Sequence, residues 1–141
     1  MKTLTLEVDY DCDFDLFGLV SSSREHKLAW TLNNILRLRL VKQQDLIYPL
    51  HQGRLVISNY LYKNEVSVLR LFRNRSLDPS TLKKPFLAPD IKEYDYLIQV
   101  CNGTGHLAGE LVAERLAALP DVQYCCQFDP NELKFKENLL F

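Results

Sequence analysis

The chain lacks the compact motifs that identify most enzymes and metalloproteins. Its 3 histidines and 4 cysteines never fall at the spacing of a zinc site or a redox pair, and no serine or cysteine sits in a nucleophile motif. No apolar run approaches the ~20 residues that cross a bilayer, and the N-terminus becomes acidic where a signal peptide needs its apolar stretch. The sequence therefore predicts a cytoplasmic protein with no catalytic residues, no metal, no cofactor and no membrane contact.

An excess of charge of one sign is also absent, because 17 basic and 18 acidic side chains leave a net charge of -1. The charges are nevertheless segregated along the chain. Residues 1–36 carry 3 basic and 6 acidic side chains, residues 37–84 carry 10 and 3, and residues 85–141 carry 4 and 9. A basic centre between acidic ends predicts either neutralisation within the fold or a patch that binds phosphate groups.

The acidic start of the chain alternates with apolar residues. In an extended strand this pattern puts every carboxylate on one face and the apolar side chains on the other. We expect a solvated or edge-protecting face, or one that pairs with Arg37 and Arg39 or with an external basic partner. A metal site would need ligands from another element, because carboxylates on a straight strand do not converge. The alternating carboxylates are Glu7, Asp9, Asp11, Asp13 and Asp15.

Two helices are predicted from apolar residues that recur at helical spacing. Ser22 and Glu25 have the spacing of a capping box, so the first helix is expected to start with Ser22 as its cap. The second is predicted over residues 107–119, and Pro120 ends it. The apolar stripes are Leu28, Leu32, Ile35 and Leu36 in the first helix and Leu107, Leu111, Val112, Leu116 and Leu119 in the second.

The rest of the chain is predicted to be strand, turn and one long loop. Lys63 and Asn64 form a two-residue connection between two β-rich runs, which predicts a hairpin. The fold class is therefore α+β: a single two-layer domain over residues 1–141, with a mixed, mostly antiparallel sheet, two helices on one face and a long loop at about residues 74–92. The apolar tail from residue 133 is expected to dock on the body. Strands are predicted at residues 7–20, 37–41, 54–62, 65–73, 94–101 and 122–128.

Trp30 is the most informative single side chain of the first helix. At 100° per residue it lies almost opposite the apolar stripe, on a face shared with His26, Asn33 and Asn34. An outward tryptophan indicates a contact surface, because aromatic side chains dominate binding energy at interfaces. The alternatives are that the C-terminal tail covers Trp30 or that a partner, which can be a second copy of the chain, covers it.

The basic central segment offers a second kind of surface. The aromatic residues Tyr60, Tyr62 and Phe72 are interleaved with its basic residues, a composition that suits phosphate contacts and base stacking on single-stranded nucleic acid. A phosphate ligand would use the same charges. A glycine-assisted turn is expected at Gly103-Thr104-Gly105, with an anion at the following helix start as the alternative. The candidate contacts for an anion or nucleic acid are Arg37, Arg39, Arg70, Arg73 and Arg75.

The segment Leu119-Pro120-Asp121-Val122-Gln123-Tyr124 leads from the second helix into a strand and resembles the signature of the IPExxxVDY family of small bacterial proteins. Leu, Asp and Gln replace the family's Ile, Glu and Asp, and the three spacer residues are absent. Residues 8–16 and 28–33 are similar to the N-terminal half of that family. The resemblance implies a small cytoplasmic bacterial protein and supplies no catalytic residues.

Three functions follow from these features. The first is a non-catalytic protein-interaction or adaptor module, with a homodimer through Trp30 as one form of it. The second is binding of RNA, other single-stranded nucleic acid or a phosphate ligand through the basic central segment. The third is a carboxylate-metal enzyme built on the acidic strand.

Overall fold

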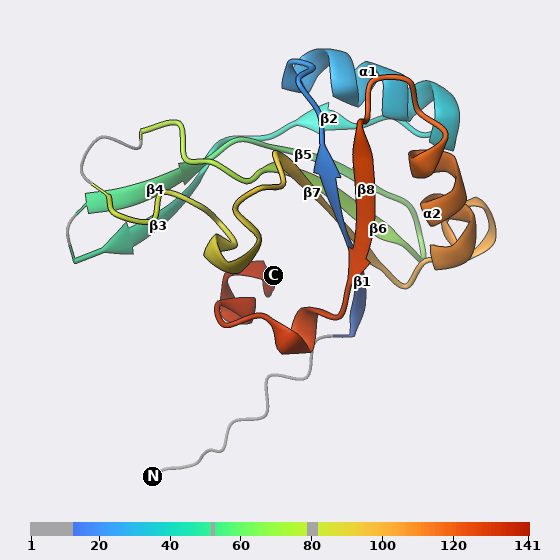
Figure 1. Ribbon diagram of the computed structural model, residues 1–141. Helices are drawn as coiled ribbons and strands as arrows, with labels where there is room; N and C mark the ends of the chain where they lie inside the picture. Colours follow the sequence, from blue (N-terminus) through green and yellow to red (C-terminus); the bar gives the residue numbers. More distant parts are fainter. Residues whose placement is uncertain (1–12, 52, 79–81) are drawn as a thin grey trace, which may run out of the picture.

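The computed structural model describes residues 13–51, 53–78 and 82–141 (Figure 1). Eight strands, two α-helices and four short 3-10 helices make up this part of the chain. The strands are β1 (Phe14–Val20), β2 (Val41–Lys42), β3 (Leu46–Leu50), β4 (Gly53–Ile57), β5 (Asn59–Lys63), β6 (Val68–Arg73), β7 (Tyr96–Cys101) and β8 (Tyr124–Phe128). The helices are α1 (Glu25–Leu36), α2 (Gly109–Ala117), η1 (Pro89–Ile91), η2 (Gly105–Leu107), η3 (Pro130–Glu132) and η4 (Lys136–Leu139).

The main sheet has the strand order β2-β5-β6-β7-β1-β8, and β3 pairs with β4 in a separate hairpin. Every pairing among the described strands is antiparallel. The two α-helices pack together against one face of the main sheet, as Figure 1 shows at the upper right. The predicted α+β class is confirmed. No helix in the described ranges is long and apolar enough to span a bilayer.

The helix-covered face buries the first of two hydrophobic cores. Leu28, Leu32 and Leu36 of α1 and Val112 and Leu116 of α2 are all buried there, so the predicted stripes are confirmed in their main positions. Removing these side chains from water is the principal driving force that holds the helices on the sheet.

The opposite face buries a second core that the sequence analysis did not anticipate. The β3–β4 hairpin, the loop before β7 and the C-terminal tail cover it, and Phe72 and Leu139 are completely buried within it. The tail therefore docks on the body, as predicted. The alternative that it covers Trp30 is wrong, because the tail and α1 lie on opposite faces of the sheet and Trp30 is 67% exposed.

The predicted capping box is also wrong. Helix α1 begins at Glu25, and no side chain in the described ranges caps it. The turn before the helix is fixed by Ser21 instead, whose N–H donates to Asp95 Oδ2 at 2.9 Å and whose hydroxyl donates to the Asp121 carbonyl at 2.5 Å. These bonds come from distant parts of the chain, so they hold the turn in a path that leaves the Ser22 side chain exposed.

Two of the predicted strands are shorter than expected. Arg37 ends α1 with a φ of 53°, and the Leu40 N–H donates to Asn33 Oδ1 at 2.8 Å instead of to a neighbouring strand. Leu38 and Leu40 are still buried with the arginines exposed, but only Val41–Lys42 pairs as strand β2. The run at residues 54–62 divides at Ser58 into β4 and β5, which belong to different sheets.

The hairpin predicted between residues 54 and 73 is confirmed as β5–β6, with a different turn. Lys63 pairs with Val68, so four residues connect the strands instead of two. Asn64 Oδ1 accepts hydrogen bonds from the N–H groups of Val66 and Ser67 at 2.8 and 2.7 Å. An asparagine side chain that binds the following backbone in this way closes the longer turn.

Candidate functional site

A basic pocket of about 690 Å³ opens where α1 begins. Residues 21–26 form one wall, and Arg73 at the end of β6 and Arg75 beyond it form another. Phe86 and Lys92 of the loop before β7 complete the rim, and residues 94–96 lie beside them. The antiparallel pairing of β6 with β7 aligns Arg73 with Tyr96, which brings segments that are far apart in the sequence to one end of the sheet.

Four basic side chains line this pocket against two carboxylates. Arg24, Arg73, Arg75 and Lys92 form no ion pair with any carboxylate in the part of the chain that the structure describes. One carboxylate, that of Asp95, already accepts the hydrogen bond from Ser21 N–H. The four basic and two acidic side chains leave the pocket with a net charge of +2.

The start of α1 adds to this positive potential. The first intrahelical bond runs from the Leu28 N–H to the Arg24 carbonyl at 3.0 Å, so the N–H groups of Glu25, His26 and Lys27 have no acceptor in the described ranges. Such N–H groups, together with the helix dipole, favour a negative charge at this end of a helix. The carboxylate of Glu25 opposes the effect in part, because it stands in the first turn.

Tyr96 fixes the inner wall of the pocket. Its hydroxyl donates to the Ser23 carbonyl at 2.6 Å. Burial raises the pKa of Tyr96, the carboxylate of Glu25 raises it further, and Arg73 acts in the opposite direction. The phenol is therefore protonated at neutral pH and holds the turn that precedes α1 against β7.

The structure separates the arginines that the sequence analysis grouped. Arg73 and Arg75 reach the basic pocket, and Arg75 lies 5.8 Å from the centre of the Phe86 ring. Arg70 points to the opposite face, where it stacks 4.5 Å from the centre of the Phe141 ring and donates to Gln99 Oε1 at 3.3 Å. Arg37 and Arg39 follow the other end of α1 and do not line the pocket.

Two cationic residues of the pocket were missed by the sequence analysis. Arg24 stands next to the predicted cap but was not considered as a ligand contact. Lys92 lies in a proline-containing loop with no periodicity, so nothing in the sequence places it near the start of α1. Only the pairing of β6 with β7 brings it there.

Two of the polar residues around Trp30 form hydrogen bonds to the backbone of α1 or of the segment that follows it. Asn33 Oδ1 accepts the Leu40 N–H bond, and Asn34 Nδ2 donates to the Trp30 carbonyl at 3.1 Å. His26 is exposed and lines the basic pocket one turn before Trp30. The contact surface predicted from the sequence is therefore centred on the indole of Trp30, with His26 shared between that surface and the pocket.

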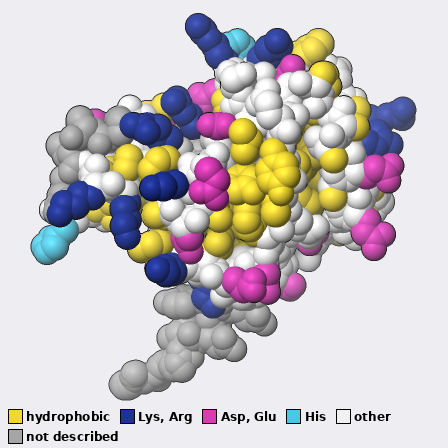
Figure 2. Space-filling view, in the orientation of Figure 1, with side chains coloured by type: hydrophobic (Ala, Val, Ile, Leu, Met, Phe, Trp, Pro, Cys, Tyr) yellow, Lys and Arg dark blue, Asp and Glu magenta, His cyan; other side chains and the backbone are white. Residues whose placement is uncertain are grey.

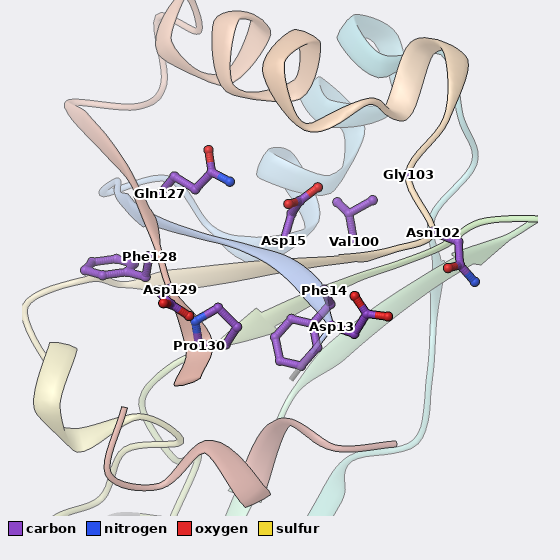
Figure 3. Close-up of a pocket in the computed structure, with 10 residues that line it drawn as sticks. All are labelled: Asp13, Phe14, Asp15, Val100, Asn102, Gly103, Gln127, Phe128, Asp129 and Pro130. Carbon is purple, nitrogen blue, oxygen red and sulfur yellow. The ribbon is translucent and has the colours of Figure 1, made fainter. Parts of the chain in front are cut away.

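A second, acidic pocket of about 450 Å³ lies at the start of β1 (Figure 3). Asp13, Asp15 and Asp129 line it, but no group of three His, Cys, Asp or Glu side chains within the described ranges could hold a metal ion. In Figure 3 Asp15 points toward α2, whereas Asp129 lies at the end of β8 beside Pro130. Asp129 Oδ1 accepts the Asn131 N–H at 3.0 Å and so caps η3.

The acidic face predicted for the first strand extends only to Asp15: Asp13, just before β1, is exposed, and Asp15 is half-buried. Asp15 shares its face with Phe17, which is completely buried under the helices, and residues 16–19 are buried on both faces. The strand is paired with β7 on one side and β8 on the other, and no solvated face continues along it past Asp15. The predictions for Glu7, Asp9 and Asp11 concern positions outside the described residues.

Asp15 also accounts for the glycine-rich segment before α2. A methyl group on Gly109 would lie 2.8 Å from Asp15 Oδ2, so this carboxylate sits at the start of α2. Gly105 adopts a φ of 57° in the turn, as a glycine-assisted turn requires. The chain therefore supplies its own negative charge where an external anion was considered.

Neither a family model nor a curated protein matches this sequence. The resemblance to the IPExxxVDY family accordingly stays a prediction.

Proposed function

We propose that the protein is a non-catalytic binding module that takes a phosphate-bearing anion in the basic pocket at the start of α1. The supporting observation is that four cations, which form no ion pair with any described residue, surround the start of α1, where no described side chain forms a cap. Like charges held around one cavity repel each other. An anion in the cavity would attract all four cations and offset this repulsion. The proposal follows the second of the three functions that the sequence indicates.

The pocket offers the groups that recognise phosphate. Guanidinium groups of Arg24 and Arg73 can each bind two phosphate oxygens at once, and Lys92 adds a compact point charge. The unbonded N–H groups at the start of α1 supply further donors. Hydroxyl groups of Ser22 and Ser23 line the same wall.

Thermal unfolding in the presence of pyrophosphate tests this proposal, because a ligand that binds only the folded state raises the unfolding temperature. At about 100 times its dissociation constant, pyrophosphate should add roughly 2.7 kcal/mol to the free energy of unfolding. Arg73→Gln should reduce the shift strongly. Arg39→Gln removes the same charge outside the pocket and is the matched control.

Equal loss of the shift in Arg73→Gln and Arg39→Gln would mean that pyrophosphate responds only to overall charge. The absence of any shift in the unaltered protein would remove the proposal altogether.

A second candidate function is protein interaction through Trp30, supported by the 67% exposure of its side chain on the outer face of α1. We propose a second copy of the chain as the occupant. His26, Asn33 and Asn34 surround the indole with polar groups, as the rim of a protein interface does, and Lys27 is an exposed basic neighbour three residues before it. The adaptor role predicted from the sequence would use the same surface.

Trp30→Ala should convert such a dimer to a monomer without changing the fold. Light scattering over a range of concentrations measures the mass, and far-ultraviolet circular dichroism reports the fold. Asn34→Ala changes the same face without removing the indole and should leave most of the dimer intact. A monomer at the highest accessible concentration would contradict this candidate.

A further inference from the structure

A second basic pocket adjoins the first. It has a volume of about 190 Å³ and shares Phe86 and Lys92 with the pocket at the start of α1. Lys83, Lys84 and Lys134 also line it. In Figure 2 Lys and Arg side chains gather over the left half of the face shown, around the loop between β6 and β7 and the β3–β4 hairpin.

Together the two pockets are much more basic than the protein as a whole. Seven basic side chains face three carboxylates, which gives a net charge of +4 on a chain whose total is -1. Two of the three carboxylates bind backbone groups: Asp95 accepts from Ser21 N–H and Asp90 accepts from Lys134 N–H at 2.7 Å. The Asp90 bond also holds the tail so that Lys134 lines the second pocket.

We propose that the two pockets form one binding track for single-stranded nucleic acid. This inference rests on the proposed function, since one phosphate occupies the first pocket at the start of α1. The strand then passes Lys92 and Phe86, which belong to both pockets, and its next phosphates meet Lys83, Lys84 and Lys134. A ligand with a single phosphate group would occupy the first pocket and would not reach the second.

Aromatic side chains favour nucleic acid over other polyanions. Phe86 lies between the two pockets, and Phe135, which is 36% exposed, lines the second. Bases stack on such rings whatever their sequence, at about 1–3 kcal/mol per base. A duplex hides the faces of its bases within its own stack, whereas a single strand presents them.

Fluorescence anisotropy with a labelled oligouridylate of about 12 nucleotides tests the inference at low salt. The double variant Lys83→Gln/Lys134→Gln should weaken oligonucleotide binding and lower the slope of affinity against salt by about two, because each lost phosphate contact lowers it by about one. The backbone N–H of residue 134 remains in this variant, so its bond to Asp90 is kept. Phe135→Leu should weaken binding by roughly 5- to 150-fold, as expected for one lost stacking contact.

Three comparisons separate this inference from the proposed function. Arg73→Gln should weaken both oligonucleotide binding and the stabilisation by pyrophosphate. Lys83→Gln/Lys134→Gln should weaken only the first. Arg37→Gln/Arg39→Gln removes two charges outside the track and should change oligonucleotide affinity by less than about twofold.

Several outcomes would overturn the inference. If pyrophosphate stabilises the protein but the oligonucleotide does not bind, the binding track is wrong and the phosphate site is still supported. If neither ligand binds, both proposals are wrong. Equally tight binding of polyglutamate with the same dependence on Phe135 would identify an acidic protein segment as the occupant, and equal affinity for duplex RNA would exclude base stacking.

Discussion

At the scale of single residues, Gly18 decides how the edge of the main sheet packs. A methyl group at this position would lie 2.8 Å from the rings of Phe128 and Tyr94, closer than carbon atoms tolerate. The two rings meet edge to face with their centres 5.0 Å apart, and Tyr124 lies 6.1 Å from Tyr94. Glycine on β1 therefore makes room for an aromatic cluster that joins β8 to the loop before β7.

We expect Gly18→Ala to lower the free energy of unfolding by about 1–3 kcal/mol, because overpacking forces both rings from their positions. Denaturant unfolding measures the change. The double variant Gly18→Ala/Phe128→Leu should lose less than the sum of the two single changes, since the smaller side chain relieves the clash. Unchanged stability in Gly18→Ala would show that the rings move without cost.

At the scale of elements, the C-terminal tail is held by side chains of the sheet and of the β3–β4 hairpin. Gln99 Nε2 donates to the Leu139 carbonyl at 2.6 Å, and the Tyr48 hydroxyl donates to the Asn138 carbonyl at 2.8 Å. Burial raises the pKa of Tyr48 to about 12, so its phenol keeps this proton well above neutral pH. Phe141 stacks on Phe72 with ring centres 5.5 Å apart.

Leu139→Ala should destabilise the protein by about 2–5 kcal/mol, because Leu139 is completely buried. Leu140→Ala is the matched control: this neighbour is 38% exposed, and its loss should cost far less. Neither change should shift the fluorescence of Trp30, the only tryptophan, since the tail lies on the other face of the sheet. A shift in Leu139→Ala while the protein remains folded would contradict that arrangement.

The elements that the sequence predicted well are those whose pattern is local. The stripes of α1 and α2 repeat every three or four residues, and burial follows them. The start of α1 was misplaced because Asp95 and Asp121 hold Ser21 from elsewhere in the chain. The run at residues 54–62 was read as one strand because its division at Ser58 depends on which strands β4 and β5 pair with.

At the scale of the whole molecule, the basic middle of the sequence does not form one patch. Arg70 goes to the tail-covered face, Arg37 and Arg39 go to the far end of α1, and only Arg73 and Arg75 reach the basic pocket. The pocket owes its charge to the fold, which adds Arg24 and Lys92 from segments with acidic totals. The charge counts along the sequence therefore indicated a phosphate site but not which basic residues form it.

The basic pocket and the surface of Trp30 lie on the same helix. His26 lines the pocket, and Trp30 follows one turn later on the outer face of α1. An anion that orders the start of α1 would thus act on the element that carries the indole. The two proposed functions are compatible in one molecule, because anion binding does not use the Trp30 side chain and dimerisation does not use the arginines of the pocket.

Amide chemical shifts during a pyrophosphate titration show residue by residue whether a phosphate-bearing anion binds at the start of α1. We expect saturable shifts concentrated at the N–H groups of Glu25, His26 and Lys27, with side-chain effects at Arg73 and Arg24. Arg73→Gln should weaken this titration, and Arg39→Gln should not. Shifts spread over all exposed basic residues, or an unperturbed start of α1, would show that the anion does not bind there.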